Sequence, residues 1–233
     1  MAQVHHTTPL PIFLDTKSKR IIYSDFEDEW EHFPGAYFIP IIGTKTKKFD
    51  GHIYIAGATD SGKSYIIQQI VLNDGKQRVP ILITDLKTKD ETFDKMKYEK
   101  FDEDSQDKGW DWLNKNWTNK ILIFDDVQFN EKVLKFKDEM LEKGRHGNTT
   151  IICVNHRLQD WHKTRVALND ASYIVTFPCS NKGKVFRYLD SEVALDRNEN
   201  REILKIACNE GRHLILHKKY PEMIATTSSI FKV

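Results

Sequence analysis

Residues 57 to 64 have the residue types and spacing of a loop that binds phosphate: they read Gly-Ala-Thr-Asp-Ser-Gly-Lys-Ser and satisfy the pattern G-x-x-x-x-G-K-S. In such a loop, successive backbone N–H groups point at phosphate oxygens, which requires glycine where a Cβ would block the turn. Lys63 then places a positive charge at the phosphates, and Ser64 offers an oxygen ligand to Mg²⁺. The pattern therefore predicts a site for ATP and Mg²⁺ formed by Gly57, Ala58, Thr59, Asp60, Ser61, Gly62, Lys63 and Ser64.

The residues on either side of this loop fit the same interpretation. Ile53 to Ala56 is strand-like, and Ser64 to Leu72 is helix-like, so the loop would lie at the positive N-terminal end of a helix. The alternative is an ordinary glycine-containing turn with an exposed lysine. Asp60 is unusual in such a loop because phosphate repels a carboxylate, so we expect its side chain to point outward.

Two adjacent carboxylates follow another apolar segment, Ile121 to Phe124. Asp125 would lie beside the phosphate loop and hold Mg²⁺ through its water shell. Asp126 is the candidate to polarise an attacking water molecule, although it could instead cap the next helix or start a turn. The pair favours hydrolysis, with water as the acceptor, over transfer to a bound hydroxyl group.

Two further polar residues have both a catalytic and a structural interpretation. Asn155 ends the apolar segment Thr150 to Val154, where it would sense the γ-phosphate or merely cap a turn. Arg145 precedes that segment and lies far from its own phosphate loop. It would either complete the site of a neighbouring subunit or remain solvated at a helix C-terminus, and residue chemistry leaves both possibilities open.

The pattern of apolar segments predicts an α/β fold. Short runs rich in Ile and Val are apolar throughout, as in strands that are covered on both faces, so we expect a mainly parallel sheet flanked by helices. Glu131 to Lys143 has apolar residues at helical spacing. The expected core strands are Ile53 to Ala56, Val79 to Thr84, Ile121 to Phe124, Thr150 to Val154 and Tyr173 to Phe177.

The rest of the chain reads as additions to this core. Residues 1–50 suggest an N-terminal β-rich extension, with short strands at Pro11 to Leu14, Arg20 to Tyr23 and Tyr37 to Ile42. Residues 51–233 would form the ATPase domain, with a charged insertion at 87–119 and a C-terminal hairpin at His213 to His217 and Met223 to Thr227. The insertion contains three tryptophans, which either pack on the core or stack on nucleic-acid bases: Trp110, Trp112 and Trp117.

Composition limits the class of protein only broadly. The 233 residues are 39% hydrophobic and 30% charged, and the formal net charge of +1 predicts neither the presence nor the absence of nucleic-acid binding. We expect neither a membrane-spanning segment nor a secretion signal. The cysteines lack the paired spacing of a zinc site and read as free thiols: Cys153, Cys179 and Cys208.

Three elements in this order, Gly57 to Ser64, Ile121 to Asp126 and Gly-Arg-His-Gly-Asn at 144–148, resemble the FtsK/HerA-type genome-packaging ATPases, most closely their poxvirus, giant-virus and virophage branch. The resemblance covers about residues 50–180 and implies a P-loop core of the RecA/FtsK-like type. It implies a pentameric or hexameric ring that threads double-stranded DNA into a preformed capsid, with capsid or portal-vertex proteins as partners, in the cytoplasm of an infected cell or in the virion. It also implies Lys63, Asp126, Asn155 and Arg145 as catalytic residues, and Ser64 and Asp125 as metal ligands.

Two positions depart from the family pattern, since many relatives have glutamate where this chain has Asp126 and glutamine where it has Asn155. Two other functions remain as alternatives. A GTPase switch would need an Asn-Lys-x-Asp sequence, and Asn181-Lys182-Gly183-Lys184 lacks the acid. A small-molecule kinase would need an arginine-rich lid. Three small basic clusters would either touch DNA phosphates or form solvated surface: Lys45, Lys47 and Lys48; Lys182, Lys184 and Arg187; Lys218 and Lys219.

Overall fold

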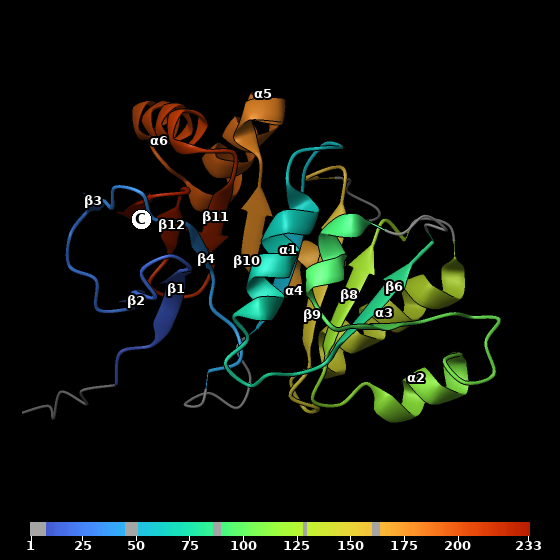
Figure 1. Ribbon diagram of the computed structural model, residues 1–233. Coiled ribbons are helices and arrows are strands. Elements are labelled where there is room, and N and C mark those ends of the chain that lie inside the picture. Colours follow the sequence, from blue (N-terminus) through green and yellow to red (C-terminus); the bar gives the residue numbers. More distant parts are fainter. Residues whose placement is uncertain (1–7, 45–50, 86–89, 128–129, 160–163) are drawn as a thin grey trace, which may run out of the picture.

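A mixed sheet of ten strands forms the centre of the protein (Figure 1), whose computed structural model describes residues 8–44, 51–85, 90–127, 130–159 and 164–233. In spatial order, the parallel strands are β10 (Ala171–Thr176), β5 (His52–Ala56), β9 (Thr150–Asn155), β8 (Ile121–Asp125), β6 (Pro80–Thr84) and β7 (Glu99–Lys100). Beyond β10, the sheet continues in antiparallel fashion with β11 (Leu214–His217), β12 (Met223–Ala225), β13 (Ser229–Lys232) and β3 (Trp30–His32). The expected α/β fold with a mainly parallel sheet is confirmed.

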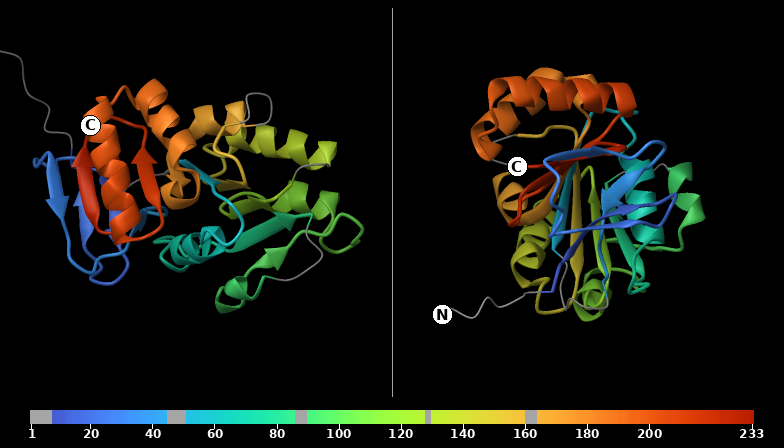
Figure 2. Two further views of the ribbon diagram at one scale, coloured as in Figure 1. Left: turned by 90° about the horizontal axis from the view of Figure 1, so that it is seen from above. Right: turned by 90° about the vertical axis from the view of Figure 1, so that its left-hand side faces the viewer.

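A second, smaller sheet packs against the antiparallel half of the first. Its strands are β1 (Pro11–Asp15), β2 (Ile21–Tyr23) and β4 (Phe38–Pro40), in the order β2-β1-β4, and Figure 2 shows them crossing the C-terminal strands. The Tyr173 hydroxyl donates a hydrogen bond to the Ile12 carbonyl over 3.0 Å, and His213 Nε2 lies 3.0 Å from the Phe38 carbonyl oxygen. These contacts fix the N-terminal strands to β10 and to the start of β11.

Helices cover both faces of the main sheet. Alternate residues of β5 face opposite ways: Ile53 and Ile55 pack with α1, whereas Tyr54 and Ala56 pack with α3. Burial on both faces is the physical reason why these strands are apolar throughout. One face carries α1 (Lys63–Leu72) and the 3₁₀ helix η1 (Glu91–Lys95); the other carries α2 (Trp110–Asn116), α3 (Glu131–Lys143), α4 (Arg165–Asp170), α5 (Pro178–Tyr188), the π-helix η2 (Leu189–Val193) and α6 (Arg197–Glu210).

The elements predicted from the sequence are all present. The five expected core strands are β5, β6, β8, β9 and β10, and the expected helix at 131–143 is α3, with the same limits. The C-terminal hairpin is formed by β11 and β12, which pair in antiparallel fashion. The sequence analysis missed the short strands β3, β7 and β13 and the helices α4, α5 and α6.

The tryptophans of the charged segment pack on the core, which confirms one of their two interpretations. Trp110, Trp112 and Trp117 are partly buried against the hydrophobic core on the α3 face. The Trp110 ring lies 5.0 Å from that of Phe101 and 5.9 Å from that of Phe136, measured between centroids. This packing attaches α2 to the face of the sheet that also carries α3.

The Gly-Arg-His-Gly-Asn segment forms a tight turn between α3 and β9, and close packing requires both of its glycines. A Cβ on Gly144 would lie 2.7 Å from the Met140 carbonyl oxygen, and a Cβ on Gly147 would lie 2.2 Å from the Trp117 ring. The Asn119 N–H also donates to the Gly147 carbonyl over 2.7 Å. The turn is therefore held against the amino-terminal edge of the sheet.

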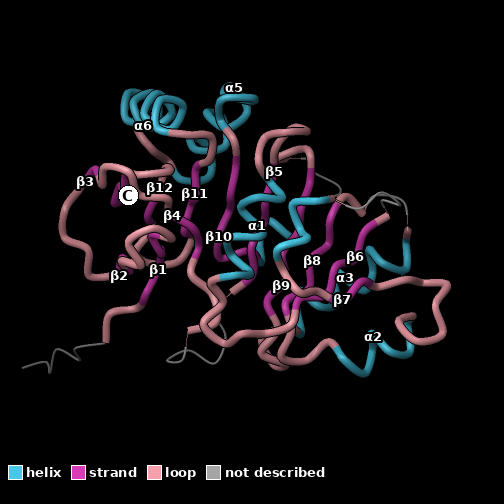
Figure 3. The backbone as a smooth tube through the Cα atoms, viewed as in Figure 1, coloured by secondary structure: helices cyan, strands magenta, loops and turns pink. Residues whose placement is uncertain are grey.

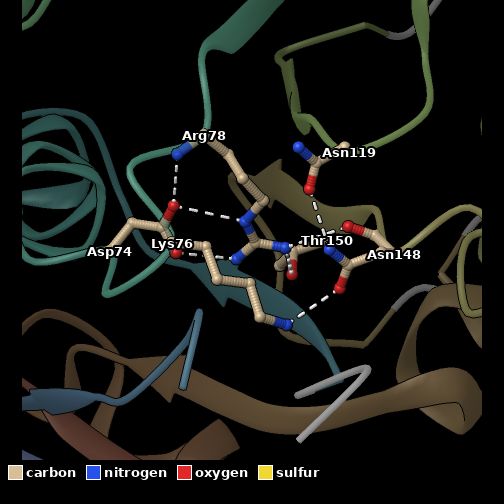
Figure 4. Close-up of polar contacts among 6 residues, drawn as sticks. All are labelled: Asp74, Lys76, Arg78, Asn119, Asn148 and Thr150. Carbon is tan, nitrogen blue, oxygen red and sulfur yellow. Dashed lines mark hydrogen bonds and ion pairs between the residues drawn. The ribbon is translucent and has the colours of Figure 1, made fainter. Parts of the chain in front are cut away.

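A buried ion pair lies between the end of α1 and this turn (Figure 4). The Asp74 carboxylate accepts hydrogen bonds from Arg78 Nε over 3.2 Å and from Arg78 Nη2 over 2.9 Å. Arg78 Nη1 donates to the Thr150 hydroxyl over 2.9 Å and to the Asn148 carbonyl over 3.3 Å. The two paired side chains are almost fully buried, so each charge depends on the other for solvation.

We expect the substitution Arg78→Met to lower the free energy of unfolding by about 3–5 kcal/mol, because it leaves the Asp74 carboxylate buried without its cation. Urea denaturation of the purified chain measures this loss. The double variant Arg78→Met with Asp74→Asn serves as the control and should recover part of the stability, since the unpaired charge is gone. An Arg78→Met protein within about 0.5 kcal/mol of the native chain would contradict the assigned role.

Candidate active site

The predicted phosphate loop joins the end of β5 to the start of α1. Gly57 donates its N–H to the Asn155 carbonyl over 3.1 Å, and a Cβ on Gly57 would lie 2.5 Å from both the Phe177 ring and the Ser61 hydroxyl oxygen. Gly62 has φ = 107°, a conformation that glycine adopts without strain. The Asp60 side chain is exposed, as expected from its charge. The loop is thus a closely packed strand-to-helix connection.

The Lys63 side chain folds back onto the backbone of this loop. Its ammonium group donates hydrogen bonds to the carbonyl oxygens of Gly57 over 3.0 Å and of Ala58 over 2.9 Å. Burial lowers the pKa of Lys63, and the neighbouring carboxylates, that of Asp126 first, oppose this shift. A bound phosphate would offer the ammonium group charged oxygen atoms in place of neutral carbonyl oxygens, and hydrogen bonds to a charged group are the stronger ones.

The strands β5, β9 and β8 are neighbours in the sheet (Figure 3). Because they run parallel, the two adjacent carboxylates at the end of β8 lie at the same edge of the sheet as the loop after β5. Burial raises the pKa of Asp125 to about 6; repulsion from Asp126 adds to this shift, and the positive charge of Lys63 opposes it. Asp125 is therefore a buried carboxyl group whose ionised form a second cation would stabilise.

Asp126 occupies an unusual backbone conformation, with φ = 51°. One carboxylate oxygen, Oδ2, lies 3.0 Å from His156 Nε2, while Oδ1 is buried and has no hydrogen-bond partner in the described part of the chain. The helix that follows is capped by Asn130, whose side chain accepts the Val133 N–H. Asp126 therefore does not cap that helix, and its Oδ1 is left without a partner among the described residues.

Asn155 ends β9, the strand between β5 and β8. The predicted end of this strand beside the Asp125 strand is confirmed, since Asp125 pairs with Val154 and Ala56 pairs with Asn155. The Asn155 carbonyl holds the phosphate loop. Its side-chain amide forms no hydrogen bond to another described residue, so it remains available at this edge.

The residues at this edge fit a nucleotide with Mg²⁺. Ser61 Oγ and Asp126 Oδ1 are buried oxygen atoms without a hydrogen-bond partner among the described residues, which indicates a missing polar group. Ser64 and Asp125 carry hard oxygen atoms of the kind that Mg²⁺ prefers as ligands. The described residues include no cluster of three or more His, Cys, Asp or Glu side chains that would hold a metal alone. A Mg²⁺ ion at this edge would therefore need phosphate and water as its remaining ligands.

Three residues near the loop were missed in the sequence analysis. Asp90 accepts a hydrogen bond from the Ser64 side chain; burial would raise the pKa of Asp90, but the bonds from Ser64 and Thr92 hold it below its ordinary value. Arg212 Nη1 donates to the Asp60 carbonyl over 3.4 Å, and His156 contacts the carboxylate already described. Only His156 had a signal in the sequence, because it directly follows Asn155.

Arg145 lies away from this edge. It is the second residue after α3, and β9 begins five residues later at Thr150 and ends at Asn155. A strand of this length spans about 16 Å, so the strand separates Arg145 from the loop of its own chain. The Arg145 side chain is exposed, and its Nε lies 3.3 Å from His146 Nε2. The structure thus brings the other predicted site residues together and leaves Arg145 at the opposite edge.

The basic clusters fall on different parts of the structure. Lys182, Lys184 and Arg187 are exposed on α5, and Lys219 is exposed after β11. Lys218 is half-buried, and its ammonium group donates to the Leu168 carbonyl over 2.5 Å. The cluster at 45–48 lies outside the described residues.

No protein-family model matches the chain. It is 27% identical over 191 residues to protein V3 of Sputnik virophage, across 74% of this chain and 73% of that protein. The crystal structure of B204, the DNA-packaging ATPase from Sulfolobus turreted icosahedral virus, superposes with a TM-score of 0.52, with 18% identity over 80% of this chain and 98% of that one. The chain has the fold of a viral DNA-packaging ATPase. B204 from Sulfolobus turreted icosahedral virus 2, in complex with ATP-gammaS, gives a TM-score of 0.44 with 18% identity over 80% of this chain and 98% of that one.

In this packaging-ATPase fold, the phosphate loop and the two carboxylates lie at the carboxyl edge of the parallel strands, the usual place for ligands in open α/β sheets.

No helix within the described ranges is long and apolar enough to cross a membrane.

We expect the apparent affinity for Mg²⁺, measured by calorimetry with a non-hydrolysable ATP analogue, to increase as the pH rises through about 6. Asp125 is protonated below that pH in the absence of the metal, and an aspartate side chain binds a metal in its ionised form. The control is Asp125→Asn, which should bind more weakly with a smaller pH dependence. The pH dependence that remains in this variant is the part that comes from titration of the nucleotide itself. An identical pH dependence in the two proteins would contradict the role of Asp125.

Proposed function

We propose that this chain is a Mg²⁺-dependent ATPase that assembles into a pentameric or hexameric ring and translocates double-stranded DNA, packaging a viral genome into a preformed capsid. The observation that carries the proposal is the separation of Arg145 from the phosphate loop by the full length of β9. A chain that exposes an arginine at the edge of the sheet opposite its phosphate loop is suited to sharing its site between neighbouring subunits.

The phosphate loop holds the ATP phosphates in this proposal. Ala58, Thr59, Asp60 and Gly62 contribute backbone N–H groups, and Lys63 contributes its ammonium group. Gly57 and Ser61 shape the loop, since their own N–H groups donate to the carbonyl oxygens of Asn155 and Ala58. Ser64 and Asp125 hold Mg²⁺, which supplies charge stabilisation at the phosphates when it is bound. Asp90 orients the Ser64 hydroxyl, with which it already shares a hydrogen bond.

Asp126 orients and deprotonates the attacking water. Its Oδ1 has no hydrogen-bond partner in the described structure and is free to accept the water proton, while His156 lies 3.0 Å from Oδ2 and fixes the plane of the carboxylate. Asn155 ends the neighbouring strand, from which its amide reaches the γ-phosphate or the water and acts as a sensor. Arg145 of the neighbouring subunit stabilises the charge that develops during transfer.

The partners follow from the same proposal. Double-stranded DNA passes through the ring, capsid or portal-vertex proteins anchor it, and the chain acts in the cytoplasm of an infected cell and in the virion. The fold shared with B204 and the similarity to a virophage protein support this assignment. A nucleotide-dependent switch or a small-molecule kinase would use the same loop, but neither would need an arginine at the far edge of the sheet.

We expect Asp126→Asn to lower ATP turnover by about 10²- to 10⁴-fold while ATP binding stays close to that of the native chain, because the amide keeps the shape of the carboxylate but cannot accept a proton. Lys63→Ala should weaken both binding and turnover. Asp111→Asn, on the exposed side of α2, is the matched control and should match the native chain. Native turnover in Asp126→Asn would remove Asp126 as the base.

We expect Arg145→Ala and Lys63→Ala, each inactive alone, to regain activity when mixed. In a mixed ring, an Arg145→Ala subunit keeps its phosphate loop and receives the arginine of a Lys63→Ala neighbour. Random mixing at equal amounts gives up to about a quarter of the native turnover, since that share of head-to-tail interfaces is competent. Arg201→Ala, on the surface of α6, is the matched control and should be fully active. Folded, assembled mixtures without activity would contradict the shared site.

A further inference from the structure

The turn that carries Arg145 is attached to the end of the phosphate-binding helix by a cluster of polar contacts, which we call the Asn148 cluster. Figure 4 shows its members, which come from the loop after α1, the segment before β8 and the start of β9. They are Asp74, Lys76, Arg78, Asn119, Asn148 and Thr150.

Asn148 is the centre of this cluster, in which its side-chain oxygen, its side-chain nitrogen and its backbone carbonyl each form a hydrogen bond. Its side-chain oxygen accepts a hydrogen bond from Lys76 Nζ over 2.8 Å, and its side-chain nitrogen donates to Asn119 Oδ1 over 2.8 Å. Its backbone carbonyl accepts from Arg78 Nη1 over 3.3 Å. Its φ of 54° lies in the left-handed region, which asparagine adopts more readily than most residues.

The other end of the cluster begins where α1 ends. Asp74 is the second residue after that helix, and its N–H donates to the Val71 carbonyl over 3.2 Å. The Asp74 carboxylate holds Arg78, and Arg78 contacts Asn148. Packed helices and paired side chains transmit position, so the turn keeps a fixed place relative to the helix that starts at Lys63.

The hydrogen bonds of the Asn148 side chain fix the position of the turn but contribute little to the free energy of unfolding. The Asp74–Arg78 pair is buried, whereas Lys76 and Asn148 are only half-buried. Exposed polar pairs contribute little to the free energy of unfolding. Arg145 itself projects from the surface, and the contact of its side chain within the described residues is with His146. Its direction therefore depends on how the turn is anchored.

We propose that Asn148 and Lys76 are positioning residues that aim Arg145 at the active site of the neighbouring subunit. This inference rests on the proposed function, in which that site uses the arginine. The two residues touch neither nucleotide nor water. They act through the turn, so a defect in them appears in the site of the next subunit and not in their own.

The variant Asn148→Gly tests this inference because glycine tolerates the positive φ while removing both side-chain hydrogen bonds. We expect turnover to fall by about 10- to 100-fold, as for a displaced catalytic group, with the KM for ATP unchanged. Lys76→Met removes one of the same contacts from the other side and should give a smaller loss. Lys115→Met, at an exposed position of α2, is the matched control and should have native turnover.

Mixing separates a positioning role from a local one. Asn148→Gly mixed with Lys63→Ala should regain activity, since the glycine variant keeps its own loop and receives a well-placed Arg145. Asn148→Gly mixed with Arg145→Ala should stay inactive, because neither subunit presents a well-placed arginine. The reverse pattern would show that Asn148 serves its own site and would overturn the inference.

Two further outcomes overturn it as well. The first is native turnover in both Asn148→Gly and Lys76→Met. The second is a lack of recovery when Arg145→Ala and Lys63→Ala are mixed, which would end the shared-site proposal too. Recovery in that mixture together with native turnover in Asn148→Gly and Lys76→Met would instead refute the positioning role alone. Thermal unfolding of each variant checks that it is folded. If Asn148→Gly does not fold, Lys76→Met is carried through the same two mixtures.

Discussion

The backbone hydrogen bond from the Gly57 N–H to the Asn155 carbonyl, 3.1 Å long, is the contact on which the arrangement of the site depends. It ties the first residue of the phosphate loop to the end of β9, the strand that lies between β5 and β8. The loop, the Asn155 amide and the carboxylates after β8 therefore keep fixed relative positions. Followed in the other direction, the same strand begins at the turn that carries Arg145. The end of β9 thus fixes the relative positions of the site residues, and the length of β9 separates that site from Arg145. If the arginine takes part in catalysis, it acts on a second copy of the chain.

The charges at this edge explain why the site suits a metal-bound nucleotide. Burial and repulsion from Asp126 raise the pKa of Asp125 to about 6, and the positive charge of Lys63 opposes this shift. A divalent cation would favour the ionised form, while the phosphates would take over the hydrogen bonds that Lys63 now gives to carbonyl groups. In the proposed mechanism, the proton of the attacking water is accepted by Oδ1 of Asp126, which has no hydrogen-bond partner among the described residues. A kinase would instead need a bound hydroxyl group at this position.

Sequence alone predicted those features that depend on local geometry. The phosphate loop requires glycines and a lysine at fixed spacing, and the core strands require apolar residues on both faces, so both could be predicted. The order of the strands, and with it the contact between His156 and Asp126, depends on the pairing of β8 with β9. The contact between Arg212 and Asp60 joins residues far apart in the chain, and no local pattern indicates it. Short strands such as β7, with two residues, lack a pattern long enough to recognise.

The measurement that tests the central claim most directly is the ATP turnover per subunit as a function of protein concentration, with and without double-stranded DNA. A site shared between subunits predicts that turnover per subunit rises with concentration as rings assemble, and a DNA motor predicts further stimulation by the duplex. Turnover that is constant with concentration and indifferent to DNA, in a chain that remains monomeric, would contradict the account and favour a switch or a kinase.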